Sequence, residues 1–153
     1  MTTMKKVAFL LIVLLCWGCS SLLNVASHGV GGRLPGYQFG VESCVGNAAE
    51  GKAYVTFTYI HRLAPQTVTL LSGNDTYAVD HVGNRYPAGY TGSQSVLRTQ
   101  PGVPQKVTME IRGIPPGISA FSVVSCRVKA ATEGVTEERS TVLTFRNIPI
   151  VWQ

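Results

Sequence analysis

Short runs in which apolar and polar residues alternate follow one another along most of the chain. The clearest run covers residues 53–59, where Val55, Phe57 and Tyr59 alternate with threonines. Because successive side chains of a strand point to opposite faces, this period of two predicts a β-strand with one buried face. The same pattern predicts strands over residues 37–41, 67–71, 76–81, 85–86, 106–111, 121–128, 141–146 and 148–152. No stretch after the N-terminal segment has the longer period of an amphipathic helix.

Turn-forming residues separate these runs. Residues 72–75 (SGND) form one such cluster, and residues 82–84 (VGN) are typical of a tight hairpin. About seven to nine short strands joined by turns favour an all-β, immunoglobulin-like sandwich of two sheets. A small closed barrel is the alternative.

The end of the chain predicts a strand with an irregularity. Leu143 and Phe145 lie on one face, whereas Ile148 and Ile150 continue an apolar face only if the facing changes by one residue at Asn147. A β-bulge beside a proline produces such a shift. We therefore expect residues 145–152 to form an integral strand with a bulge.

The N-terminus has the features of an export signal. Two lysines precede an apolar run over residues 7–17, which is shorter than the ~20 residues of a membrane-spanning helix. Gly18 and Cys19, with Leu14 and Leu15 upstream, resemble the bacterial lipoprotein signal, which implies acylation of Cys19. Ordinary secretion, with cleavage after Ser21 or nearer residue 26, stays open, as does an uncleaved anchor over residues 7–23.

Residues 20–36 are rich in glycine and serine and predict a flexible tether. The expected organisation is therefore a signal segment over residues 1–19, a tether over 20–36 and a sandwich domain over 37–153. By the same resemblance, Ser20 after the acylated cysteine favours the outer membrane, facing the periplasm or the cell surface.

Two cysteines remain in the predicted domain. In an oxidising compartment, Cys44 and Cys126 are a natural disulfide pair. Strand parity opposes this pairing, because Cys126 shares a face with apolar residues and Cys44 shares one with polar residues. A bulge at Gly40 or Gly46 would turn Cys44 inward. The alternative is two unpaired cysteines, one buried and one exposed.

The charge pattern argues against a nucleic-acid partner. The formal net charge is +5, and the basic residues are scattered instead of gathered into a run with aromatic residues. With only 14% charged and 45% apolar residues, the composition is that of a chain that buries a core.

Residues with catalytic or metal-binding chemistry do not cluster in the sequence. His28, His61 and His81 lack metal-ligand spacing, and no Gly-x-Ser-x-Gly motif is present. We expect no catalytic residue, metal or cofactor. The segment 85–90 (RYPAGY) is a candidate loop contact through Arg85, Tyr86 and Tyr90, although packing of the tyrosines against the sandwich is the more common arrangement.

Three segments carry a family resemblance: residues 80–86, 102–111 and 145–150. In these segments the chain resembles small bacterial lipoproteins that have an immunoglobulin-like domain of unassigned function. The expected function is a non-enzymatic, membrane-tethered binding or structural module of the cell envelope that contacts an unknown protein or glycan through loops. An envelope hydrolase or a metal-dependent enzyme on a β-sandwich is the alternative.

Overall fold

Residues 29–91 and 95–153 are described by the computed structural model, and they form 11 β-strands with connecting turns. In chain order the strands are β1 (Val30–Gly31), β2 (Tyr37–Asn47), β3 (Lys52–His61), β4 (Gln66–Leu71), β5 (Tyr77–Asp80), β6 (Arg85–Tyr90), β7 (Val96–Thr99), β8 (Gln105–Arg112), β9 (Ala120–Thr132), β10 (Glu138–Pro149) and β11 (Val151–Trp152).

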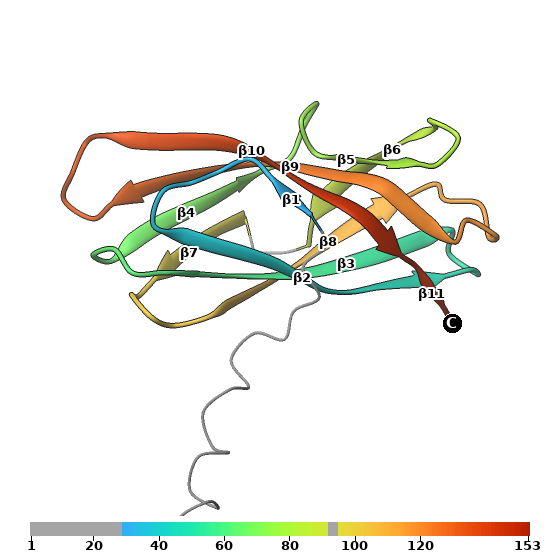
Figure 1. Ribbon diagram of the computed structural model, residues 1–153, viewed down its shortest axis with the longest axis horizontal. Coiled ribbons are helices and arrows are strands. Elements are labelled where there is room, and N and C mark those ends of the chain that lie inside the picture. The colour runs from blue at the N-terminus through green and yellow to red at the C-terminus, as the bar shows by residue number, and fades with distance from the viewer. Residues whose placement is uncertain (1–28, 92–94) are drawn as a thin grey trace, which may run out of the picture.

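The strands form two layers (Figure 1). In the first layer, sheet A, β10 lies between β1 and β9, and the other edge of β9 pairs with β4 and with β5. The second layer, sheet B, has the order β11, β2, β3, β8 and β6. The predicted all-β, two-sheet sandwich is confirmed, with more strands than the sequence pattern indicated.

Two strands connect the layers. The first half of β6 pairs with β5 in sheet A, and its second half pairs with β8 in sheet B. After β10 ends in sheet A, Ile150 leads into β11, which joins sheet B in parallel with β2. The sandwich is thus joined by β6 along one side and by the β10–β11 crossing at one end of the other side.

The inward faces of both sheets form one apolar core. Phe57 of sheet B and Phe145 of sheet A are fully buried, with ring centroids 5.4 Å apart across the interface. Burial of each large side chain contributes about 1.5–3 kcal/mol.

A bulge in β2 sets the direction of Cys44. The pairing of β2 with β3 shifts between Val41 and Ser43, so Glu42 is the extra residue. As a result Val41 and Cys44 both face the core and are each 3% exposed. From the sequence, a bulge at Gly40 or Gly46 was the condition for Cys44 to face inward, and the structure has the bulge at Glu42 instead.

The change of facing near the end of β10 has a different cause from the predicted bulge. The register of β10 against β9 does not shift across Asn147, since Arg146 pairs with Val123 and Ile148 pairs with Phe121. Asn147 instead adopts a left-handed conformation with φ of 55°, which asparagine tolerates better than most residues. Phe145 and Ile148, on either side of it, are both buried. Residues 145–152 are thus part of the sandwich, but as the end of β10 and as β11 in the other sheet and not as the single strand that was predicted, and the predicted bulge is wrong.

The folded domain begins earlier than the sequence indicated. Val30 and Gly31 pair with Phe145 and Thr144 of β10, and Leu34 is 2% exposed. Residues 29–36 therefore belong to the sandwich and not to a free tether. The glycines in this segment allow the chain to lie close to β10, where a Cβ would clash.

Candidate functional site

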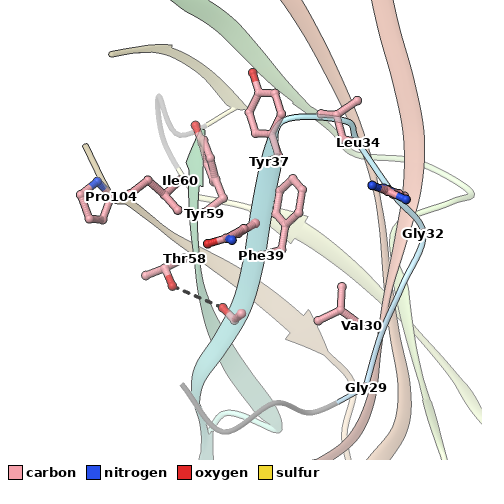
Figure 2. Close-up of a pocket in the computed structure, with 13 residues that line it drawn as sticks. Gly29, Val30, Gly32, Leu34, Tyr37, Phe39, Thr58, Tyr59, Ile60 and Pro104 are labelled. Atoms are coloured by element: carbon pink, nitrogen blue, oxygen red, sulfur yellow. Dashed lines mark hydrogen bonds between the residues drawn. The ribbon is translucent and has the colours of Figure 1, made fainter. Parts of the chain in front are cut away.

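A groove with a volume of about 480 Å³ opens between the segment containing β1 and the first half of β2. We call it the β1–β2 groove (Figure 2). The residues that line it are Gly29, Val30, Gly32, Arg33, Leu34, Tyr37, Gln38, Phe39, Gly40, Thr58, Tyr59, Ile60 and Pro104. Its size falls within the ~300–1,000 Å³ of ordinary ligand pockets.

The groove exists because the two sheets stay apart at this edge. β1 pairs with β10 of sheet A, and β2 pairs with β3 of sheet B. On its outer side β2 meets β11 only at Val45 and Gly46. Between β1 and the first half of β2, side chains from the sandwich interior therefore reach the surface.

Three aromatic rings form one wall of the groove. Tyr37 and Phe39 lie on the inward face of β2, and register places Tyr59 of β3 opposite Phe39. The Tyr37 and Phe39 rings are stacked with centroids 5.9 Å apart, and Phe39 and Tyr59 are 5.8 Å apart. Together they give a broad apolar surface at low conformational cost.

The hydroxyl of Tyr59 is buried without a hydrogen-bond partner among the described residues. Tyr59 is 1% exposed, and this burial raises the pKa of its hydroxyl above the ordinary value. A buried polar group that makes no hydrogen bond costs about 1–3 kcal/mol. An acceptor atom of a bound molecule would remove that cost.

Polar residues next to the aromatic wall are engaged with one another. Tyr37 donates to Gln66 Oε1 at 3.4 Å, and burial raises the pKa of Tyr37 to about 12 although Arg139 opposes the shift. His61 is 1% exposed and lies 2.8 Å from Thr99 Oγ1 through Nε2, and burial lowers its pKa. At neutral pH His61 is therefore an uncharged core residue.

Two arginines lie in or beside the groove. Arg33 lines the groove itself. Arg62 lines an adjoining hollow of about 300 Å³, which shares Tyr37, Gln38 and Ile60 with the groove. Neither hollow has an aspartate or glutamate among the described residues that line it.

The predicted loop contact has a different structure from the one expected. The segment 85–90 is strand β6, and Tyr86 is 8% exposed with its hydroxyl 2.9 Å from Asp80 Oδ2. The Tyr90 hydroxyl is also buried. Tyr86 and Tyr90 therefore pack in the sandwich, which is the more common arrangement for such residues, and cannot anchor a partner.

Arg85, the third predicted contact residue, remains exposed. Its guanidinium lies over the ring of Tyr77, with Cζ 3.6 Å from the centroid, and bonds the carbonyl of Asn74. With Asp75 and Pro87 these residues line a second, more open hollow of about 620 Å³.

Asp80 stabilises the hairpin that follows it. The carboxylate is 3% exposed and accepts bonds of 2.8–2.9 Å from the backbone of residues 82–84 and from the side chains of Asn84 and Tyr86. Burial opposes the charged form, but these hydrogen bonds hold the pKa of Asp80 well below its ordinary value. All the acceptor capacity is used inside the hairpin, so Asp80 is a structural residue.

The predicted disulfide is absent. Cys44 and Cys126 are both free and buried, so the expected alternative of one buried and one exposed cysteine is also wrong. Burial raises the pKa of each thiol to about 12. Both cysteines pack as small apolar residues, one on each sheet.

Other expectations concern ions, membranes and the N-terminus. Among residues 29–91 and 95–153, no group of three or more His, Cys, Asp and Glu is placed to hold a metal ion. In the same ranges no helix is long and apolar enough to cross a membrane. The acylation site predicted at Cys19 and the signal segment lie outside the described residues.

No family model and no curated protein matches this chain. Among solved structures, it is similar to the ASH/PapD-like domain of human CEP192 (PapD-like domain 7), with a TM-score of 0.40 and 12% sequence identity. The similarity covers 88% of this chain and 90% of that domain.

Proposed function

We propose that this chain is a non-enzymatic binding module of the bacterial cell envelope, held on the outer membrane by a lipid on Cys19, and that it binds its ligand in the β1–β2 groove. The observation that supports this most strongly is an apolar groove of about 480 Å³ lined by Tyr59, whose buried hydroxyl has no hydrogen-bond partner among the described residues. Largely apolar pockets with a few polar groups are the usual form of binding sites.

The position of the groove fits a tethered protein. Gly29 and Val30 form part of the wall and are the first described residues. Nine residues separate Cys19 from Gly29, so the stretch between them spans at most about 35 Å. A lipid on Cys19 would therefore keep the groove close to the membrane surface.

The test places a photo-crosslinking residue at Gln38, an exposed residue of the groove, in cells that carry the full-length protein. Val82, which is 74% exposed in the hairpin after β5, is the matched control position. We expect a defined adduct from position 38 and none from position 82. Adducts from position 82 alone would show that the partner binds through the loops and not in the groove. Intact mass of the membrane-extracted protein checks the acyl group on Cys19 independently.

The hollow beside Arg85 is a second candidate surface. An exposed guanidinium stacked on Tyr77, next to the backbone and side chains of residues 73–75, offers an aromatic face with hydrogen-bonding groups around it. This combination suits a glycan. Arg85→Ala should abolish binding to envelope glycans if this surface is used, and it should leave adducts from position 38 unchanged.

A further inference from the structure

The β1–β2 groove combines an apolar channel with a cationic and hydrogen-bonding end. Figure 2 shows the hydroxyls of Tyr37 and Tyr59 at one end of the groove, with Val30 and Gly29 toward the other. Arg62 lines the adjoining hollow, which shares Tyr37 with the groove, so a second positive charge lies beside the groove. A ligand that fills this space would be apolar along most of its length and negatively charged at one end.

We propose that the groove binds one free fatty acid taken from the adjacent bilayer, with its carboxylate at the Tyr59 end and its hydrocarbon chain along Phe39 and Val30. This inference rests on the proposed function, because the tether is what keeps the groove near a membrane. The lining residues match both parts of the ligand. Apolar walls suit the hydrocarbon chain, and two arginines without an aspartate or glutamate among the described lining residues suit the carboxylate.

The Tyr59 hydroxyl distinguishes the carboxylate from a purely apolar ligand. It is a donor with no acceptor among the described residues, and Tyr59 as a whole is only 1% exposed. A carboxylate oxygen is an acceptor that forms short, strong hydrogen bonds with such donors. Removal of the hydroxyl would weaken the binding of a fatty acid but not the binding of a hydrocarbon.

An extended peptide is the competing occupant, since the first half of β2 pairs with β3 on one side only. A peptide strand would bond to that free edge and place alternate side chains in the groove. The fatty acid is the better fit because the groove has the volume of a small-molecule site, with mostly apolar lining residues, Arg33 among them and Arg62 in the adjoining hollow.

The experiment uses the full chain in phosphatidylcholine vesicles that contain palmitate carrying a diazirine near the end of its chain. We expect light-dependent adducts on residues 30–40 and 58–60, located by peptide mapping. Unlabelled palmitate should compete about tenfold better than its methyl ester, which is the combined effect of two exposed ion pairs. Equal competition by acid and ester would overturn the inference.

Variants separate binding in the groove from general membrane contact. Tyr59→Phe should lower labelling several-fold while leaving the thermal transition unchanged or higher, because the substitution removes an unsatisfied hydroxyl. Phe39→Glu should reduce labelling at least about tenfold, since it places a charge in the apolar channel. Val151→Glu, at a position that is 63% exposed on β11, is the matched control and should label as the parent does.

The role of the arginines is best tested at an exposed position, where a substitution does not disturb folding. Arg62 is exposed, so Arg62→Glu tests the charge without disturbing the core, and Arg98→Glu on β7 is its control because Arg98 lines neither hollow. We expect weaker labelling for the first and parental labelling for the second. Equal labelling of Arg62→Glu and Phe39→Glu with the parent would mean nonspecific contact and would overturn the proposal.

Failure of this inference differs from failure of the tether. A chain that is acylated and floats with the vesicles, yet gains no adduct in the groove, contradicts the fatty acid and leaves the tether intact. A chain that stays in solution but is labelled in the groove contradicts the tether alone. If the photo-crosslinker at Gln38 joins only to another polypeptide, the occupant is a peptide strand and the fatty-acid inference fails.

Discussion

The indole ring of Trp152 lies directly on the backbone of Gly46, so that the end of the chain closes against sheet B. A Cβ at Gly46 would come within 2.8 Å of Cζ3 of Trp152, and closer to Cδ2. The contact is held by pairing of Trp152 with Gly46 and by a bond of 2.9 Å from the amide of Gln153 to the Gly46 carbonyl. The indole Nε1 donates to the carbonyl of Ile118 at 2.7 Å.

Gly46→Ala should therefore destabilise the protein by about 1–3 kcal/mol, the range for overpacking a well-filled site. Chemical denaturation measures the free energy of unfolding. Gly89→Ala in β6 is the matched control, because a Cβ there would meet only Ser72 Oγ at 3.7 Å. We expect little change for Gly89→Ala. The double variant Gly46→Ala with Trp152→Ala should lose less free energy of unfolding than the sum of the losses of the two single variants. The reason is that removal of the indole ring also removes its clash with the new Cβ.

The buried cysteines should be unreactive in the folded protein. Because burial raises the pKa of Cys44 and of Cys126 to about 12, almost no thiolate forms at pH 8. Iodoacetamide should modify both residues only after denaturation, at a rate that follows unfolding. Rapid alkylation of the native protein would contradict the buried positions, and a Cys44–Cys126 peptide in a nonreducing map would restore the disulfide that the sequence predicted.

Asp80 should make stability depend on pH at the acidic side. Its folded pKa lies below the ordinary value of 3.8, so its contribution is complete above that value and is lost as pH falls toward the folded pKa. Asp80→Asn should lower the free energy of unfolding at pH 7 and reduce the further loss between about pH 5 and pH 3. Denaturant titrations at these pH values measure both effects. Glu133→Gln, at an exposed loop position, is the control and should keep the parental profile.

How far the sequence predicted this structure depends on whether the information was local. Alternation in residues 53–59 identified β3 and its buried face, because a single strand carries that pattern by itself. The position of the bulge in β2 was not predicted correctly, since glycines were the only sequence signal and Glu42 is the extra residue instead. A bulge depends on which partner residues pair, which is not local information.

The groove could not be predicted from the sequence pattern either. Tyr37 and Phe39 were assigned to a strand, and Tyr59 to another, but their meeting at an unpaired sheet edge depends on where β1 and β11 attach. The assignment of residues 85–90 to a loop was wrong for a related reason. Tyrosines beside proline and glycine are typical of a loop, whereas here Pro87 lies in a strand that bridges two sheets.

The two ends of the chain should differ in their importance for folding. Truncation after Asn147 removes Ile148 and Ile150, which are 1% and 8% exposed, together with the Trp152 contact. Each buried side chain contributes about 1.5–3 kcal/mol, a large part of the ~5–15 kcal/mol margin of a small domain. The truncated chain should lose its cooperative thermal transition and its dispersed amide spectrum.

A chain that begins at Gly29 is the matched comparison, because it keeps β1 and Leu34. It should melt as the parent does, whereas a chain that begins at Arg33 should melt at a lower temperature, since it loses the pairing of Val30 and Gly31 with β10. Differential scanning calorimetry of the three truncations measures these transitions. A cooperative melt of the chain that ends at Asn147 would show that β11 is dispensable, and its site on β2 would then be an open edge to which another strand can add.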